Sequence, residues 1–310
     1  MRNWTRSILL SLLLASLCFA PPSKPIRGMQ GSRTHRLAKN LVGWWVMNEA
    51  TGRTIYDLSG NGNHGTLEGD THWVAGKYGS CLSFDGDGDY VDVDNNPYQT
   101  SNIFSSGLSF SVWIKSPFAK DNNRRSIVGG GGANHFYSAG GIYVYTGSDY
   151  TYAAMEIYRG DYYTASTDGV INLTPDNWYH IVGVYNSLSN QVEIYLNGVN
   201  EVNTSVSESG TTYDPDNFYI GRNPRSSFNP TFNGLIDNVM VFDRALSAEE
   251  IQALYTDPFQ MFEEPARQLY AAGGAAGEPE RPQIILIGSL TPLTILTASL
   301  AFASCKRKAA

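Results

Sequence analysis

Apolar and polar residues alternate along several short stretches of this chain, with the period of two that a half-buried β-strand produces. Val192, Ile194 and Leu196 share one face of such a stretch, with polar or aromatic residues between them. Leu41–Met47 is instead a continuous β-branched and aromatic run, which indicates a buried strand. Together these patterns predict strands over residues 41–47, 81–84, 89–93, 108–115, 126–128, 141–145, 152–158, 178–185, 191–196, 217–220 and 234–242.

Turns rich in Gly, Asn and Asp separate these stretches, which favours an all-β sandwich of two sheets. Asn197-Gly198 is typical of a type I′ hairpin. One short helix is predicted after Ser247. The Ser247 hydroxyl can cap the first turn, and the Glu250 side chain three residues later can bond back to the Ser247 backbone in a capping box. Pro258 ends that helix.

Composition supports a sheet protein and excludes one class of partner. The 310 residues include 19 tyrosines and 31 glycines, and only 16% are charged. The net charge of −7 leaves no basic face to neutralise phosphates, so we expect no nucleic-acid partner. Cys18 and Cys305 lie in hydrophobic terminal segments, so no disulfide can form within the central domain, and Cys81 is expected to be a small buried residue.

The N-terminal residues indicate export. Residues 1–20 have the layout of a secretory signal peptide, with Arg2 and Arg6 before an apolar run. Because Pro21 directly follows the expected cut, an uncleaved anchor is the alternative. Residues 21–40 are basic and show no apolar period, so we expect a flexible leader there.

The C-terminal residues indicate membrane attachment. Residues 284–304 form an uncharged run of the length that a bilayer-crossing helix needs, and the basic residues 305–310 are expected to stay cytoplasmic. A buried C-terminal element is the alternative. Residues 263–283 have the composition of a linker, which leaves 41–262 as a domain displayed at the cell surface.

This domain carries an ordered series of short motifs. They are Leu41–Trp45, Asp57–Gly65, Phe84–Gly86, Phe110–Ile114, Trp178–His180, Tyr195–Gly198, Ile220–Gly221 and the run from Gly234 to Ile251. In this order they resemble the laminin-G-like, concanavalin A-like jelly-roll domains of bacterial and phage-associated surface proteins. The resemblance implies two antiparallel sheets with adjacent first and last strands. It also implies carbohydrate or protein binding and a structural calcium ion.

One candidate metal site follows from these motifs. Asp57, Asn61 and Asn63 lie in a glycine-rich loop and offer the oxygen ligands that calcium prefers. The resemblance brings Asp237 near this loop, because it pairs the terminal strands. We therefore expect a structural calcium ion at Asp57, Asn61, Asn63 and Asp237. A turn closed by Asx hydrogen bonds, with Asp237 serving the backbone, is the alternative.

A tyrosine-rich stretch from Tyr143 to Tyr163 is the candidate ligand surface. Tyr143 and Tyr145 share one strand face, and Tyr152 can lie beside them across a tight turn. Such a platform would let a sugar ring stack on the aromatic side chains. Ordinary cross-strand packing explains the same pattern and is the alternative.

The residues that catalysis would need are not found. The Glu-x-Asp-x-x-Glu strand of retaining glycosidases is missing, and the histidines have no metal-ligand spacing. We therefore expect a non-catalytic extracellular module that binds a glycan or a surface protein. Two alternatives remain: a glycoside hydrolase or lyase of the same fold with other acids, and a purely structural module of an envelope or phage particle.

Overall fold

The computed structural model describes only part of the chain. The described residues are 22, 24–25, 31–93, 95, 97, 106–131, 138–158, 161–207, 217–223 and 231–262. The chain divides into two units, Met1–Glu264 and Pro265–Ala310, and every described residue belongs to the first.

The expected terminal segments are therefore not covered. The signal peptide at 1–20, the linker at 263–283, the transmembrane helix at 284–304 and the basic tail at 305–310 all lie outside the described residues. Within the part that is described, no helix combines the length and the apolarity needed to cross a bilayer.

The described residues form two antiparallel sheets of eight strands each. In sheet A the order is β14-β13-β12-β7-β16-β5-β4, with β1 paired to β16. Its strands are β1 (Leu41–Trp45), β4 (His72–Ala75), β5 (Ser80–Asp85), β7 (Leu108–Lys115), β12 (Tyr179–Asn186), β13 (Gln191–Leu196), β14 (Val199–Ser205) and β16 (Asn233–Phe242). In sheet B the order is β11-β10-β9-β8-β15-β6-β3-β2. Its strands are β2 (Thr54–Ile55), β3 (Gly65–Glu68), β6 (Tyr90–Val93), β8 (Asn123–Gly131), β9 (Ser138–Thr146), β10 (Thr151–Tyr158), β11 (Tyr162–Ser166) and β15 (Asn217–Ile220).

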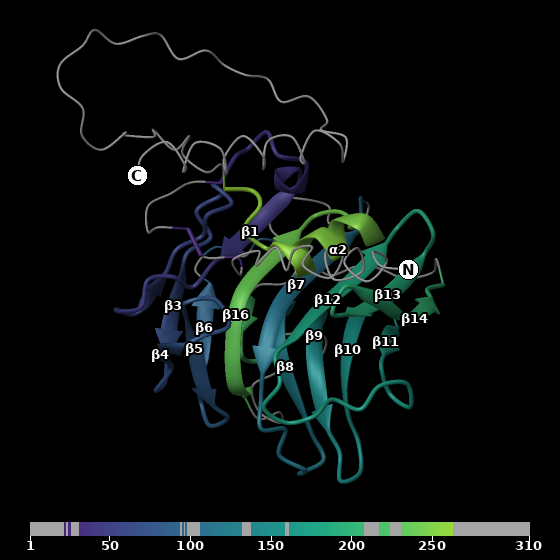
Figure 1. Ribbon diagram of the computed structural model, residues 1–310. Helices are drawn as coiled ribbons and strands as arrows, with labels where there is room; N and C mark the ends of the chain where they lie inside the picture. Colours follow the sequence, from purple (N-terminus) through teal and green to yellow (C-terminus); the bar gives the residue numbers. More distant parts are fainter. Residues whose placement is uncertain are drawn as a thin grey trace, which may run out of the picture. The chain divides into compact units, whose positions relative to one another are not determined.

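The last strand, β16, organises sheet A. One edge of it pairs with β7, while the other pairs first with β5 and then with β1, as Figure 1 shows. Trp45 of β1 lies opposite Val239 of β16. The expected two-sheet jelly roll with adjacent first and last strands is therefore confirmed.

The main core lies between the two sheets. Alternation sorts the residues of each strand: Ile181 of β12 and Val241 of β16 face this core, whereas Val182 and Met240 face the other side of sheet A. Trp45 and Phe218 stack within the core, with ring centroids 5.6 Å apart. Sheet A is thus apolar on both faces, which explains its continuous apolar runs.

A second, smaller core covers the outer face of sheet A. It is closed by η1, a 3₁₀ helix at Arg36–Ala38, by α2, an α-helix at Ala248–Thr256, and by the turns that follow α2. Ile251 and Leu254 of α2 are buried. The predicted capping box is confirmed, because the Ser247 hydroxyl accepts from the Glu250 N–H and the Glu250 carboxylate accepts from the Ser247 N–H.

Part of the segment expected to be a flexible leader packs against the domain instead. Leu37 of η1 is fully buried in the outer core. The Ser32 N–H donates to the Met261 carbonyl at 2.7 Å, and Lys24 is buried against Asp237. The leader expectation rested on composition, and composition does not register a single buried leucine or lysine.

Candidate functional site

The predicted arrangement of three tyrosines is formed by two neighbouring strands of sheet B. Tyr143 and Tyr145 lie on the same face of β9, and Tyr152 of β10 is the direct cross-strand partner of Tyr145. The turn between the strands is closed by the Gly147 N–H, which donates to the Tyr150 carbonyl at 2.8 Å. The cross-strand placement of Tyr152 is therefore as expected.

Three tyrosine rings form a stack at this end of the sheet. The centroids of Tyr145 and Tyr152 are 5.3 Å apart, with an interplanar angle of 23°. Tyr150 lies 6.0 Å from each of them, at 28° to Tyr145 and 11° to Tyr152. Tyr150 is 46% exposed, so the stack, here called the tyrosine stack, presents aromatic surface to solvent. Tyr150 belongs to the tyrosine-rich stretch but was not expected in the platform.

Tyr143 does not belong to the exposed stack. It is buried, and the Arg124 guanidinium lies 3.6 Å from its ring centroid. Both Glu156 oxygens accept from Arg124, at 2.6 and 3.0 Å, which fixes the guanidinium over the ring. Burial raises the pKa of Tyr143 well above its ordinary value. Tyr143 therefore supports the platform from within, and its expected direct contact with a ligand does not fit this burial.

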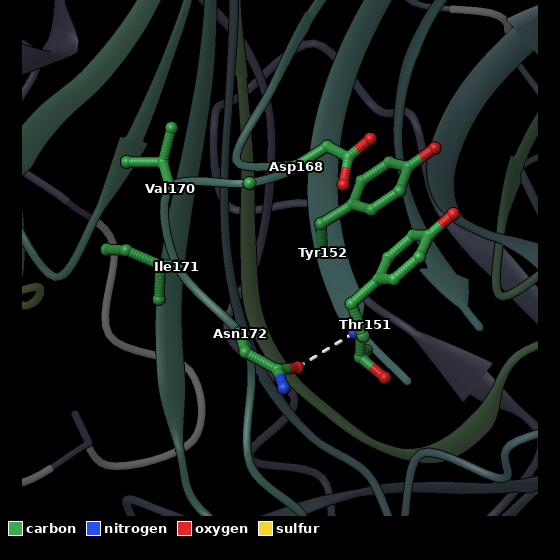
Figure 2. Close-up of a pocket in the computed structure, with 8 residues that line it drawn as sticks. Thr151, Tyr152, Asp168, Val170, Ile171 and Asn172 are labelled. Atoms are coloured by element: carbon green, nitrogen blue, oxygen red, sulfur yellow. Dashed lines mark hydrogen bonds between the residues drawn. The ribbon is translucent and has the colours of Figure 1, made fainter. Parts of the chain in front are cut away.

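A pocket of about 220 Å³ adjoins the tyrosine stack. It is lined by the start of β10 and by the segment from Asp168 to Asn172 that follows β11. Figure 2 shows the Asp168 carboxylate beside the Tyr152 ring, and Asn172 directed at Thr151. The Asn172 amide oxygen accepts from the Thr151 N–H at 2.8 Å, which holds the segment against the strand.

The pocket combines an aromatic wall with polar groups. Burial raises the pKa of Tyr152, and the negative charge of Asp168 adds to this effect. Asp168 is itself exposed, so its carboxylate can accept hydrogen bonds from a ligand. Flat aromatic surface next to such an acceptor suits a ligand that is apolar on one face and carries hydroxyl groups at its edge. Asp168 and Asn172 were not predicted, because their sequence context is an ordinary polar loop.

Asp57, the first predicted calcium ligand, is occupied by hydrogen bonds from the chain. One oxygen accepts from the Trp44 N–H at 2.9 Å and the Ser59 N–H at 2.8 Å. The other accepts from the Asn63 N–H at 3.0 Å and the Ser59 hydroxyl at 2.8 Å. This is the geometry of the Asx-bonded turn that the sequence left open.

The two asparagines use their amide nitrogens in the same loop. The Asn61 amide donates to the Leu41 carbonyl at 3.0 Å, and the Asn63 amide donates to the Val42 carbonyl at 2.6 Å. These bonds tie the loop to β1. They direct nitrogen donors to carbonyl groups and therefore do not gather oxygens around a common point.

Asp237, the fourth predicted ligand, has separate partners. Its carboxylate is paired with the Lys24 ammonium and also accepts from the Tyr78 N–H at 3.3 Å. Burial raises its pKa, while the charge of Lys24 opposes that shift. Among the described residues, no group of three or more His, Cys, Asp or Glu side chains could hold a metal ion. As arranged, the four residues do not fit one calcium ion, and calcium binding stays a prediction.

His180 and Cys81 are two further titratable residues, and both are buried. His180 is fully buried between Trp113 and Tyr255, and its Nε2 lies 2.9 Å from the Ser111 hydroxyl. Burial lowers the pKa of His180 to about 3, so the ring is neutral near pH 7. Burial also raises the pKa of the Cys81 thiol to about 12. Both residues pack in the domain, as the sequence predicts for Cys81.

Comparison with known proteins assigns this domain to a superfamily. The profile of the "Concanavalin A-like lectin/glucanases superfamily" matches residues 85–252. No curated protein sequence matches the chain significantly.

Solved structures share the fold at low sequence identity. Domain 4 of AbnA, a GH43 extracellular arabinanase from Geobacillus stearothermophilus, in complex with arabinotriose, matches with a TM-score of 0.53 and 19% identity, over 70% of this chain and 98% of that domain. The receptor binding domain of a botulinum neurotoxin C/D mosaic serotype matches with a TM-score of 0.53 and 15% identity, over 70% and 51%. Trypanosoma rangeli sialidase in complex with sialic acid matches with a TM-score of 0.54 and 18% identity, over 73% and 34%. The chain therefore spans about half of the toxin domain and a third of the sialidase.

Proposed function

The chain belongs to the concanavalin A-like lectin/glucanase superfamily, and on that premise we propose that it is a non-catalytic module that binds a glycan at the tyrosine stack. The single observation that carries this proposal is the stack of Tyr145, Tyr150 and Tyr152, which is partly exposed and borders a pocket.

The chemistry of the stack favours a sugar over a purely apolar ligand. A pyranose or furanose ring has C–H groups on one face and hydroxyl groups at its rim, so it packs on an aromatic ring and hydrogen bonds at its edge. The tyrosine stack supplies the aromatic surface, and the exposed Asp168 carboxylate supplies an acceptor for hydroxyl groups. The pocket volume of about 220 Å³ suits one or two sugar units better than a long buried chain.

The fold is compatible with this role without deciding it. Domain 4 of the arabinanase was solved with arabinotriose, and the sialidase with sialic acid. Because these proteins include enzymes, the fold serves both binding and catalysis, and the residues of the site decide between them.

The site itself favours binding over turnover. Retaining and inverting glycosidases need two carboxyl groups that face the same glycosidic bond. Glu156 lies on the same strand as Tyr152, but both of its oxygens are held by Arg124. Among the residues that line the pocket, Asp168 is the one carboxylate, and one carboxylate does not supply both catalytic roles. A glycoside hydrolase or lyase is the alternative, and a reducing-end assay on the bound polysaccharide tests it.

Placement outside the cell completes the proposal. The signal-peptide pattern at 1–20 and the apolar run at 284–304 support export and attachment to a membrane. The acidic net charge supports a glycan or protein partner rather than a nucleic acid. Fractionation of cells, with protease added to intact cells, tests whether the domain is displayed at the surface.

The experiment that tests the function is a glycan array probed with the purified protein in calcium and in chelator. The proposal expects selective binding to a subset of glycans and no release of reducing ends from them. Binding that is identical in both solutions would remove calcium from the binding mechanism. An array without any signal, from protein that is shown to be folded, would reject glycan binding in favour of a structural or protein-binding role.

A further inference from the structure

The Lys24 ammonium lies in a buried cage of oxygen atoms. It donates to the Met47 carbonyl at 3.0 Å, and also to the Ser80 carbonyl and to one oxygen of the Asp237 carboxylate. The Lys24 side chain is only 5% exposed and that of Asp237 is fully buried. A buried ammonium is stable only where such acceptors replace its water shell.

The three acceptors come from parts of the domain that are far apart in the sequence. Met47 follows β1, Ser80 begins β5, and Asp237 lies in the middle of β16. All three groups are acceptors without a proton to donate, so the cage is complementary to a hydrogen-bond donor, and the charge of Asp237 favours a donor that is a cation.

The cage is held in place by bonds that do not involve Lys24. The Ser80 hydroxyl donates to the Met47 carbonyl at 2.8 Å, and the Tyr78 N–H donates to the second Asp237 oxygen at 3.3 Å. Gly76 lies so close to that oxygen that a Cβ built on it would be 2.8 Å away. The acceptors are therefore positioned by the domain, and the cage does not depend on Lys24 for its shape.

The local charges also favour a cation. Asp237 and Glu49 both lie close enough to raise the pKa of Lys24, although burial lowers it overall. Lys77 is a second cation near Asp237, half-buried with its ammonium 4.3 Å from the ring centroid of Trp113. If Lys24 were removed, Lys77 would remain near the Asp237 carboxylate, but no cation would lie inside the cage.

The segment that carries Lys24 is fixed at a second point. The Asn48 amide donates to the Pro25 carbonyl at 2.9 Å. Asn48 directly follows Met47, so the same connection after β1 holds both the backbone and the ammonium of residues 24–25.

We propose that the Met47 and Ser80 carbonyls and the Asp237 carboxylate form a cation site in which Lys24 is the resident cation. The N-terminal segment is then a structural part of the domain. Cleavage of a signal peptide after residue 20 leaves Lys24 in the mature protein, whereas cleavage beyond it removes the cation. Once vacated, the site accepts a free cation that hard oxygen ligands can bind, such as an alkylammonium or a calcium ion.

The test compares the thermal unfolding of the full chain and of its Lys24→Ala variant in chelator, with calcium and with propylammonium, which replaces the deleted atoms. The variant is expected to lose about 10 °C in Tm in chelator, because it leaves a buried carboxylate unpaired. Either cation should restore part of that loss in a saturable way and leave the wild-type Tm unchanged. Lys39→Ala, an exposed lysine of the same segment, is the matched control.

A double substitution keeps the test decisive if Lys24→Ala does not fold. Lys24→Met with Asp237→Asn removes both charges, and this protein should be more stable than Lys24→Met alone and should not respond to either cation. The proposal is overturned if Lys24→Ala unfolds at the wild-type temperature. It is equally overturned if neither cation raises the Tm of a destabilised variant, or if the double variant responds as strongly as the single one.

Discussion

Replacing Asp57 with alanine is the substitution whose effect the structure defines best. It removes the four hydrogen bonds that the carboxylate accepts, three of them from the backbone N–H groups of Trp44, Ser59 and Asn63. Asp57 is 6% exposed, so water cannot easily replace the lost acceptor. The N–H groups of Trp44 and Asn63 would stay buried without a partner.

The expected loss can be worked out from these contacts. A buried donor left without an acceptor costs about 1–3 kcal/mol, and the partly exposed Ser59 costs less. The sum is about 4 kcal/mol, which corresponds to a fall in Tm of roughly 10 °C for a domain of this size. Asp57→Asn keeps one oxygen in place and should lose about half as much free energy of unfolding.

The assay is chemical and thermal unfolding in calcium and in chelator, with the exposed Asp87→Ala as the matched control. The hydrogen-bond account predicts the same loss for Asp57→Ala in both solutions and almost none for Asp87→Ala. The reasoning is refuted if chelation lowers the wild-type Tm as far as the substitution does and leaves Asp57→Ala unaffected. That result would assign the carboxylate to a metal ion.

Three further predictions concern the fold. Ser247→Ala breaks the capping box with Glu250 and should cost about 1 kcal/mol, seen as a Tm lower by a few degrees. Because burial lowers the folded-state pKa of His180 to about 3, the unfolded chain binds a proton there that the folded chain does not. Stability should therefore fall between pH 6.5 and pH 3, by roughly 2 kcal/mol at pH 5, and His180→Gln should flatten this slope in Tm against pH. Gly234 has φ of +138°, and a Cβ there would lie 2.3 Å from the Lys115 carbonyl oxygen, so Gly234→Ala should cost about 3 kcal/mol in denaturant unfolding.

The strands with regular patterns could be predicted from the sequence. Leu108–Lys115 and Gln191–Leu196 have the predicted bounds, and the Asn197-Gly198 turn has both residues at positive φ, as a type I′ hairpin requires. Five strands of the described part of the chain were missed: β2, β3, β4, β11 and β14. For β4 and β14 the reason is that their residues are largely exposed or polar and give no apolar period. Their strand conformation comes from pairing with a neighbour at the edge of sheet A.

The candidate site was predictable only in part. Side chains alternate between the two faces along β9, and a tight turn follows that strand, so Tyr152 lies beside Tyr145. Both features can be read from a short stretch of sequence. The burial of Tyr143 could not be predicted, because it depends on Arg124 and Glu156 arriving from the strands on either side. Sequence patterns report which face a residue takes and do not report what covers that face.

Contacts over long sequence separations account for the other differences. Lys24 and Asp237 are 213 residues apart, and no local pattern links a lysine in a polar leader to a carboxylate in the last strand. Resemblance to the family placed Asp237 near the Asp57 loop through the pairing of the terminal strands. That pairing exists, but the two carboxylates have different partners.

The most direct test of the proposed function is isothermal titration of a glycan selected on the array into the wild-type protein and the Tyr152→Ala variant. Tyr56→Ala is the control, because Tyr56 is also exposed but follows β2 at the opposite edge of sheet B. Loss of one stacking ring should weaken binding about 10-fold, while Tyr56→Ala leaves the affinity unchanged and all three proteins keep the same Tm within a few degrees. Equal affinity of the wild-type protein and the Tyr152→Ala variant would contradict a glycan site at the tyrosine stack.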